Sequence, residues 1–247
     1  MNSSNFNLQF IHLNSVDSTN IYALELLRKK KGKEGMIVST DFQEKGKGQL
    51  GALWQSERGK NLLFSLVLSP AIKVERQFQL SKIISLGIKK YLDTLAVEDV
   101  KIKWPNDILV GQKKVAGILI ENSVFGNLVS HSIVGVGFNL NQIDFEHCKR
   151  QPTSLKLLTG IQFTVEEELK RMIDCILTVY EERKSQSLEI DHTYVQNLFG
   201  YGKPIRLRDE KGEFFGVILA VLPNGHLQVN RNGTLESYDL KEIEFLE

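Results

Sequence analysis

The sequence predicts an α+β fold in which a mixed β-sheet flanked by helices is followed by a small C-terminal β-barrel. Amphipathic stripes alternate with short β-rich runs as far as residue 199. From residue 200 the pattern changes to about five short strands separated by turn signals. We therefore expect one domain over residues 1–199 and a smaller one over residues 200–247, which packs on its neighbour because so small a unit is seldom stable alone.

Four helices are expected in the larger domain. The first follows residues 16–20 and ends near Gly32, which is placed as a C-terminal cap. The second covers residues 75–96, where apolar side chains recur at helical spacing. Thr164 and Glu167 are spaced as a capping box at the start of the third, and a fourth covers residues 188–199.

Strands are expected wherever short β-rich runs are bounded by turn residues. In the larger domain these runs are residues 36–40, 61–68, 101–104, 114–121 and 129–140. In the smaller domain they are residues 203–208, 213–222, 226–229, 234–238 and 241–246. In the larger domain, a glycine-rich segment lies between the expected strands 36–40 and 61–68. It is therefore a loop that joins two strands and not a Walker loop, which opens a helix.

Composition excludes several classes of protein. The chain has 31 Lys and Arg against 30 Asp and Glu, so no net field attracts nucleic acid or an anionic membrane. Its two cysteines, Cys148 and Cys175, lack the spacing of a zinc site or disulfide framework and are expected to be core or surface thiols. Without a signal peptide or an apolar run of about 18 residues, the chain is expected in the cytoplasm, away from membranes.

The segment DFQEKGKGQLGALWQS, residues 41–56, concentrates glycines around a lysine. Gly46, Gly48 and Gly51 permit positive φ or close approach to a ligand, and Lys47 adds a positive charge. These residues are typical of an anion-binding loop. A flexible surface loop has the same composition, and the segment alone leaves both interpretations open.

Five motifs follow one another in order: VDSTN at 16–20, the glycine loop, KWPND at 103–107, KKVAGILIEN at 113–122 and GVGFNLN at 135–141. Together they resemble the biotin protein ligases, over residues 10–190 and in the C-terminal barrel, which is SH3-like in that family. The resemblance implies that biotin and MgATP give biotinyl-5′-AMP and pyrophosphate. A lysine of a biotin carboxyl carrier protein domain then takes the biotinyl group.

The resemblance also implies the roles of individual residues. Biotin would be bound by Ser18, Thr19, Asn20, Gln43, Lys47, Gly48, Gln49, Lys114 and Gly117. ATP or the adenylate would be bound by Gly46, Lys47, Gly48, Trp54, Lys103, Asn106 and Asn139. Lys114, Lys47 and Asp107 form the expected catalytic group, with Asp107 either orienting Lys114 or holding a metal-bound water. ATP and Mg²⁺ are the implied cofactors, and no direct protein ligand to a metal is predicted.

Read without the resemblance, the same residues have structural interpretations. Ser18 or Thr19 suits a helix N-cap, Lys114 a solvated strand edge and Trp54 a buried core position. The glycine loop also departs from the family form GRGRRGR, because Gln49 and Ala52 stand where arginines are common. Lysine cannot reproduce the bidentate fork of arginine on phosphate, so we expect weaker retention of the adenylate than in an arginine-rich relative.

Three other functions fit parts of the sequence. A lipoate ligase or octanoyltransferase shares the superfamily fold, but the motif set favours biotin. A biotin-responsive repressor needs an N-terminal helix-turn-helix module, for which about ten residues are too few, so no DNA binding is expected. The basic residues of the first C-terminal hairpin could mark a peptide- or nucleic-acid-binding module, although a solvated strand face explains them. An exposed strand could serve a homodimer or dock the carrier.

Overall fold

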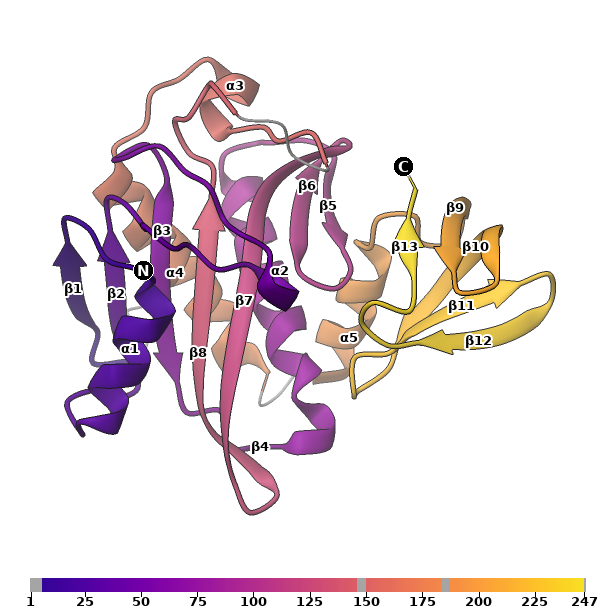
Figure 1. The fold of residues 1–247 in the computed structure, drawn as a ribbon, viewed down its shortest axis with the longest axis horizontal. Coiled ribbons are helices and arrows are strands. Elements are labelled where there is room, and N and C mark those ends of the chain that lie inside the picture. Colours follow the sequence, from indigo (N-terminus) through magenta and orange to yellow (C-terminus); the bar gives the residue numbers. More distant parts are fainter. Residues whose placement is uncertain (1–5, 146–149, 184–186, 247) are drawn as a thin grey trace.

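The larger part of the chain is built on an eight-stranded mixed sheet (Figure 1). The computed structural model describes residues 6–145, 150–183 and 187–246. The strands run β1-β2-β3-β8-β7-β6-β5, with β4 paired to β8, and only the β1–β2 pair is parallel among these described pairings. Their bounds are β1 Gln9–Leu13, β2 Met36–Thr40, β3 Leu62–Leu68, β4 Ile72–Lys73, β5 Val100–Lys103, β6 Asp107–Val110, β7 Lys113–Phe125 and β8 Leu128–Phe138.

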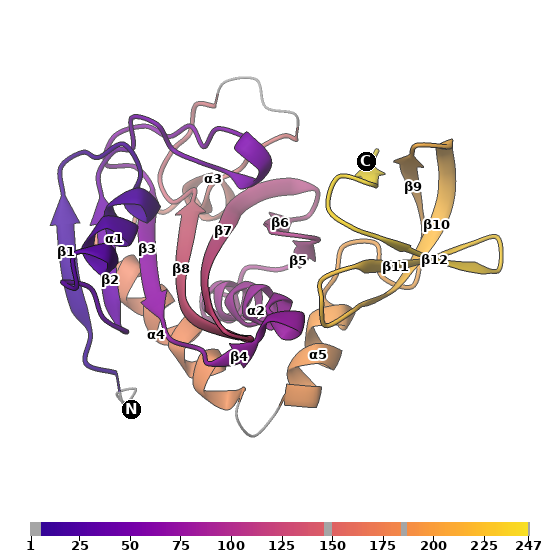
Figure 2. The same ribbon diagram turned by 60° about the horizontal axis from the view of Figure 1, so that its bottom comes forward.

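Helices cover the two faces of this sheet unequally. They are α1 Thr19–Arg28, α2 Phe78–Thr94, α3 Leu155–Thr159, α4 Val165–Glu182 and α5 Ser187–Gln196. α2 and α4 lie together across one face and bury the main core (Figure 2). α1 packs on the other face at the β2–β3 end, around Ala23, and the rest of that face is left to the glycine loop. Among the described helices, none has the length and apolar character needed to span a membrane.

Local capping was predicted incorrectly in two places. Gly32 does not end α1, because Lys29 occupies the C-cap and the next residue, Lys30, turns the chain with φ 56°. Thr164 is the N-cap of α4, but its side chain makes no capping hydrogen bond, so the capping box with Glu167 is absent. Cys175 is a free, partly buried thiol, and Cys148 lies outside the described residues.

The C-terminal residues form a five-stranded antiparallel sheet in the order β12-β11-β10-β9-β13. Its strands are β9 Pro204–Asp209, β10 Gly212–Val221, β11 Leu227–Arg231, β12 Thr234–Tyr238 and β13 Glu244–Phe245. The strand expected over 241–246 is thus only two residues long. No pairing of β12 with β13 occurs among the described strands, so the expected closed barrel is an open sheet here.

Two buried polar contacts join the C-terminal sheet to the larger part. The indole Nε1 of Trp104, in the KWPND motif, donates a 2.9 Å hydrogen bond to the carbonyl oxygen of Gly225. Lys82 of α2 is 3% exposed and donates to Asp191 Oδ1 at 2.7 Å and to the Val221 carbonyl oxygen at 3.1 Å. Trp104 is 3% exposed, so its indole is buried at this junction.

Removing one partner of the Lys82–Asp191 pair should destabilise the protein strongly. We expect Asp191→Ala to lower the free energy of unfolding by about 2–3 kcal/mol, because a buried ammonium loses its counter-charge. Lys82→Met should cost less than about 1 kcal/mol, since no charge is then left buried. Asp93→Ala, which breaks the exposed Lys89–Asp93 pair, is the control and should cost about 0.5 kcal/mol or less. Equal losses for the two aspartate variants in urea unfolding would contradict this.

Candidate active site

A floor of bare backbone lies at the centre of the sheet face that α2 and α4 do not cover. In the β7–β8 register Gly117 pairs with Gly137 and Leu119 with Gly135, so three of these four positions lack a side chain. The indole of Trp54 fills part of the space above them. A Cβ added at Gly137 would lie 2.3 Å from its ring, and one added at Gly117 would lie 3.0 Å away. Glycine is therefore required here for close approach.

Above this floor is a cavity of about 390 Å³, called the smaller cavity below. It brings together thirteen of the predicted site residues, which come from four separate segments of the chain. They are Ser18, Thr19, Asn20, Gln43, Lys47, Gly48, Gln49, Trp54, Lys103, Asn106, Asp107, Lys114 and Gly117. Gly46 and Asn139 do not line it. Residues from motifs that are far apart in the sequence therefore lie around one cavity.

One wall of the smaller cavity is polar and is supplied by the start of α1. Ser18 occupies the N-cap position but makes no side-chain capping bond, although it is only 2% exposed. The backbone N–H of Thr19 donates to Gln43 Oε1 at 2.9 Å. Ser18 is therefore the N-cap of α1 by position, as that interpretation expects, but its hydroxyl does not cap the helix and belongs to the cavity wall.

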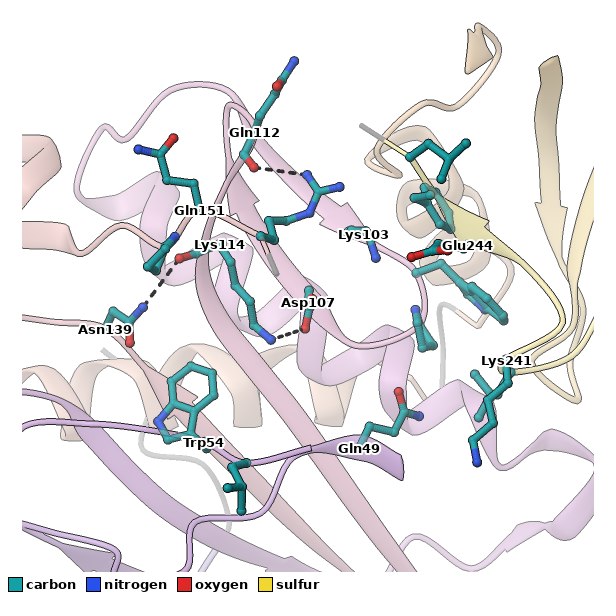
Figure 3. A pocket seen from close by; sticks show the side chains of 18 of the residues that line it. Gln49, Trp54, Lys103, Asp107, Gln112, Lys114, Asn139, Gln151, Lys241 and Glu244 are labelled. Carbon is teal, nitrogen blue, oxygen red and sulfur yellow. Dashed lines mark hydrogen bonds and ion pairs between the residues drawn. The ribbon is translucent and has the colours of Figure 1, made fainter. Parts of the chain in front are cut away.

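Lys114 and Asp107 form an ion pair at the opposite side of the smaller cavity. Lys114 Nζ lies 2.7 Å from Asp107 Oδ1, and the two side chains point toward one another in Figure 3. The ammonium also lies 5.4 Å from the centre of the Trp54 ring, within cation–π range. Lys114 is 27% exposed, so it is not a solvated strand-edge lysine, whereas its neighbour Lys113 is exposed. Asp107 fixes the direction in which Lys114 presents its charge.

The glycines of the loop serve different purposes. Among them only Gly51 has a positive φ, of 83°, where the loop makes a short 3₁₀ turn over Gln49–Gly51. Gly46 is buried, and a Cβ there would lie 2.5 Å from the Trp54 carbonyl oxygen, so it allows two arms of the loop to pack together. Gly46 thus supports the loop from outside the cavity. Lys47 is exposed at the rim.

A second, larger cavity of about 1090 Å³ adjoins the first and extends to the C-terminal sheet. It shares Gln49, Leu53, Trp54, Lys103, Asp107 and Lys114 with the smaller cavity. Lys103 lies with its ammonium 4.6 Å from the Phe245 ring of β13. Figure 3 shows the C-terminal segment, with Lys241 and Glu244, facing the loop residue Gln49 across this space. The last residues of the chain therefore complete a cavity that begins on the larger sheet.

The larger cavity is electropositive. Four cationic side chains line it against two carboxylates: Lys103, Lys114, Arg150 and Lys241 against Asp107 and Glu244. Burial lowers the pKa of the Arg150 guanidinium from its ordinary value, while the charge of Asp107 acts in the opposite direction. An arginine remains charged under any such shift at neutral pH. Such a cavity suits a polyanionic ligand.

Two predicted asparagines hold the walls in place. Asn106 Nδ2 donates to the Ile118 carbonyl oxygen at 3.0 Å, which fixes the KWPND turn against β7. Asn139 Nδ2 donates to the Thr153 carbonyl oxygen at 3.0 Å, and the residue lines only the larger cavity. Both amide groups therefore shape the site through backbone contacts that the sequence does not reveal.

Several residues at the site were not predicted from the sequence. Ser65 and Glu121 lie behind the polar wall, where each is hydrogen-bonded to a predicted residue. Arg150 enters the larger cavity from the segment after β8. Ser65 left one signal, because it is the only polar residue in the strand LLFSLVL. A lone hydroxyl in a wholly buried strand needs a partner.

Comparison with known proteins agrees with this geometry. Residues 13–139 match the model of the biotin/lipoate A/B protein ligase family. The bifunctional ligase/repressor BirA of Bacillus subtilis is 30% identical over 219 residues, which are 85% of this chain and 66% of that protein. The biotin–[acetyl-CoA-carboxylase] ligase of Paracoccus denitrificans is 29% identical over 222 residues, covering 85% of this chain and 90% of that one. The biotin protein ligase of Aquifex aeolicus, solved with biotin and ATP, superposes with a TM-score of 0.78 and 27% identity, covering 97% and 98%.

The chain therefore belongs to the biotin/lipoate A/B protein ligase family. It is an enzyme of the ligase class, as are the relatives named above.

Proposed function

We propose that this ligase activates biotin with ATP to biotinyl-5′-AMP and then transfers biotin to a lysine of a biotin carboxyl carrier protein domain. The observation that carries the proposal is the position of Lys114. It lines both cavities, so a single ammonium stands where a ligand in the polar smaller cavity would meet a polyanion in the electropositive larger one. Relatives whose names specify biotin, and one solved with biotin and ATP, support this choice of substrates.

In the first step a carboxylate oxygen of biotin attacks the α-phosphorus of ATP, the new P–O bond forms, and pyrophosphate leaves. Two anions must be brought together, so positive charge has to be fixed in advance at the meeting point. Lys114, held by Asp107 at 2.7 Å, would supply it. Lys47 at the rim would add a second charge. The buried indole Nε1 of Trp54 has no partner within the described chain, so a ligand acceptor would satisfy it.

In the second step the neutral amine of the carrier lysine attacks the acyl carbon, and AMP leaves with the bonding electrons. The amine must lose a proton, and we assign no dedicated base among the described residues. The phosphate oxygens of the adenylate are themselves acceptors at the reacting centre. Catalysis here rests on positioning and on charge, which supply large rate factors without a covalent enzyme intermediate.

Mg²⁺ suits this site as a companion of the nucleotide. Within the described residues no group of three His, Cys, Asp or Glu side chains is placed to hold a metal. Mg²⁺ keeps several waters and binds well to phosphate oxygens with few protein ligands. Bound there, it would neutralise part of the triphosphate charge. Lys103, Arg150 and Lys241 would face the same phosphates from the cavity wall.

A lipoate ligase or octanoyltransferase is the alternative, and the polar wall argues against it. Ser18, Thr19 and Gln43 present hydroxyl and amide groups inside the smaller cavity. Thr19 and Gln43 already bond to one another. What a saturated acyl chain or dithiolane ring would leave unpaired is the hydrogen-bonding capacity that the wall keeps toward the cavity, at about 1–3 kcal/mol for each group so buried. The ureido ring of biotin has both donors and a carbonyl acceptor to pair with them.

The test is ATP–pyrophosphate exchange with biotin or with lipoate, followed by transfer to a purified carrier domain. We expect exchange with biotin and little with lipoate, because only biotin satisfies the polar wall. Transfer should then consume the adenylate stoichiometrically. Exchange with lipoate alone would overturn the biotin assignment, and exchange with neither acid would overturn both.

We extend the proposal to the organisation of the chain. Residues 1–199 would form the catalytic domain, and residues 200–247 an SH3-like unit that helps to enclose the nucleotide and to receive the carrier. Lining of the larger cavity by residues 240–246 supports this division of labour. We place the enzyme in the cytoplasm, where ATP is available.

A further inference from the structure

Behind the polar wall, one side chain spans three strands. Asn20 extends from α1 across the bare backbone of Gly135, where a Cβ would lie 2.4 Å from Asn20 Oδ1. Ser65 of β3 pairs with Gly135 on one side, and Leu119 of β7 pairs with it on the other. Because Gly135 has no side chain, Asn20 can cross β8 at this position and contact both β3 and β7.

The contacts of Asn20 fix the orientation of its amide. Its Nδ2 donates to Glu121 Oε2 at 2.7 Å and to the Leu119 carbonyl oxygen at 3.3 Å. Both of these partners can only accept, so the nitrogen must point toward β7. The amide oxygen then points toward β3, where Ser65 Oγ lies 2.6 Å away.

This orientation determines what Ser65 can do. Ser65 is fully buried and has a single hydroxyl hydrogen. An amide oxygen cannot donate, so that hydrogen is committed to Asn20 Oδ1. Thr19 Oγ1 lies 2.7 Å from Ser65 Oγ and 3.2 Å from Gln43 Oε1, and both of these atoms have lone pairs available. The hydroxyl hydrogen of Thr19 is therefore used inside the wall, whichever of the two receives it.

We propose that Glu121, Asn20 and Ser65 form a polarised hydrogen-bond chain that presents Thr19 Oγ1 to the smaller cavity as an acceptor, selecting ligands that have an N–H group at this point. The inference rests on the proposed function, because the ureido N–H of biotin is the donor that it assigns to Thr19. It makes Asn20 a positioning residue that acts through Ser65 and Thr19. Lipoate and fatty acids have no N–H group to offer.

Ser65→Ala is the direct test, with Ser132→Ala as its matched control. Ser132 is likewise fully buried in the sheet and donates to an asparagine, Asn122, at 2.7 Å. Asn122 lines neither cavity, whereas Asn20, the partner of Ser65, lines the smaller one. Ser65→Ala should raise KM for biotin in pyrophosphate exchange about tenfold, because the hydrogen-bond chain behind Thr19 is broken at the biotin end of the site. KM for ATP should stay unchanged, because the hydrogen-bond chain does not reach the larger cavity. Ser132→Ala should leave both constants unchanged.

Glu121 provides a second test that does not disturb the core, because its side chain is exposed. Glu121→Gln keeps an acceptor for Asn20 Nδ2 and should stay within about threefold of the natural protein in KM for biotin. Glu121→Leu removes the acceptor and should raise that KM about fivefold, again without a change for ATP. Desthiobiotin retains the ureido group but lacks sulfur. Its binding should therefore weaken in the Ser65 and Glu121 variants by the same factor as the binding of biotin.

The outcomes separate this inference from the function on which it rests. Failure of the natural protein to exchange pyrophosphate with biotin would overturn the function. Normal exchange by the natural protein, together with an unchanged KM for biotin in Ser65→Ala, would overturn only the proposed role of the hydrogen-bond chain. A rise in both the biotin and ATP constants, matched by a fall in melting temperature, would also overturn it, because that pattern marks a merely structural serine.

Discussion

Lys114→Ala should reduce kcat/KM for biotin-dependent pyrophosphate exchange by about 10²–10³-fold. In the proposed reaction the ammonium lies where the two anions meet, and removing one preorganised charge or donor from such a site typically costs that much. Part of the loss should appear in kcat, because the charge that develops at the α-phosphoryl group is greatest in the transition state. The measurement is steady-state exchange at saturating ATP.

Lys113→Ala is the matched control for this experiment. Lys113 precedes Lys114 on β7 but is exposed and lines neither cavity. Its removal should leave exchange within about twofold of the natural rate, as expected for a surface change. Circular dichroism should show both variants folded. A folded Lys114→Ala protein with near-normal exchange would rule out the proposed role of this ammonium.

Gly137→Ala should lower exchange about hundredfold through a single methyl group. That methyl would lie 2.3 Å from the Trp54 ring, so the indole has to leave the glycine floor. A displacement of about 1 Å in a positioning group can cost about 10²-fold in rate. Trp54 also contacts Lys114, at 5.4 Å from ring centre to ammonium, so moving the ring also disturbs the ammonium to which we assign the catalytic charge.

A double-mutant cycle with Trp54→Ala checks this mechanism. If the methyl group acts by displacing the indole, Gly137→Ala should cost less than about threefold when Trp54 is already absent, because the two sites are in direct contact and their effects are not additive. A full hundredfold loss in both backgrounds would show that the methyl group excludes the substrate itself. The purified variants should also be compared by thermal unfolding, so that loss of fold is not mistaken for loss of rate.

Long periodic segments of the fold were predictable from the sequence. The stripe of α2 places Leu80, Ile84, Ile88 and Tyr91 at zero exposure, as its helical spacing indicates. β6 was missed because its four residues directly follow Pro105 and Asn106, which are strong turn signals. The prediction of a barrel was wrong in one respect, because the C-terminal sheet is open and not closed. Whether the first and last strands of a sheet meet depends on its twist and stagger, which the number of strands does not reveal.

The site was predictable as a set of motifs but not as a network. Four of the five ordered motifs supplied predicted residues that line the smaller cavity, because each carries polar or glycine positions out of keeping with its local element. The partners of those residues could not be found in this way. Ser65 lies 46 positions after Thr19, and Glu121 lies 101 positions after Asn20. Such pairings arise only when β3, β7 and α1 are brought together by tertiary packing.

The hydrogen bond from Trp104 to Gly225 joins residues 121 positions apart and connects the small sheet directly to a wall of the larger cavity. Trp104 stands between Lys103 and Pro105, two residues of the larger cavity, so a shift of the turn at Gly225 would be transmitted directly to that wall. If the larger cavity binds the nucleotide as proposed, substitutions near Gly225 would then change nucleotide binding without altering any predicted site residue. A variant survey that scored only the five motifs would classify such changes as harmless.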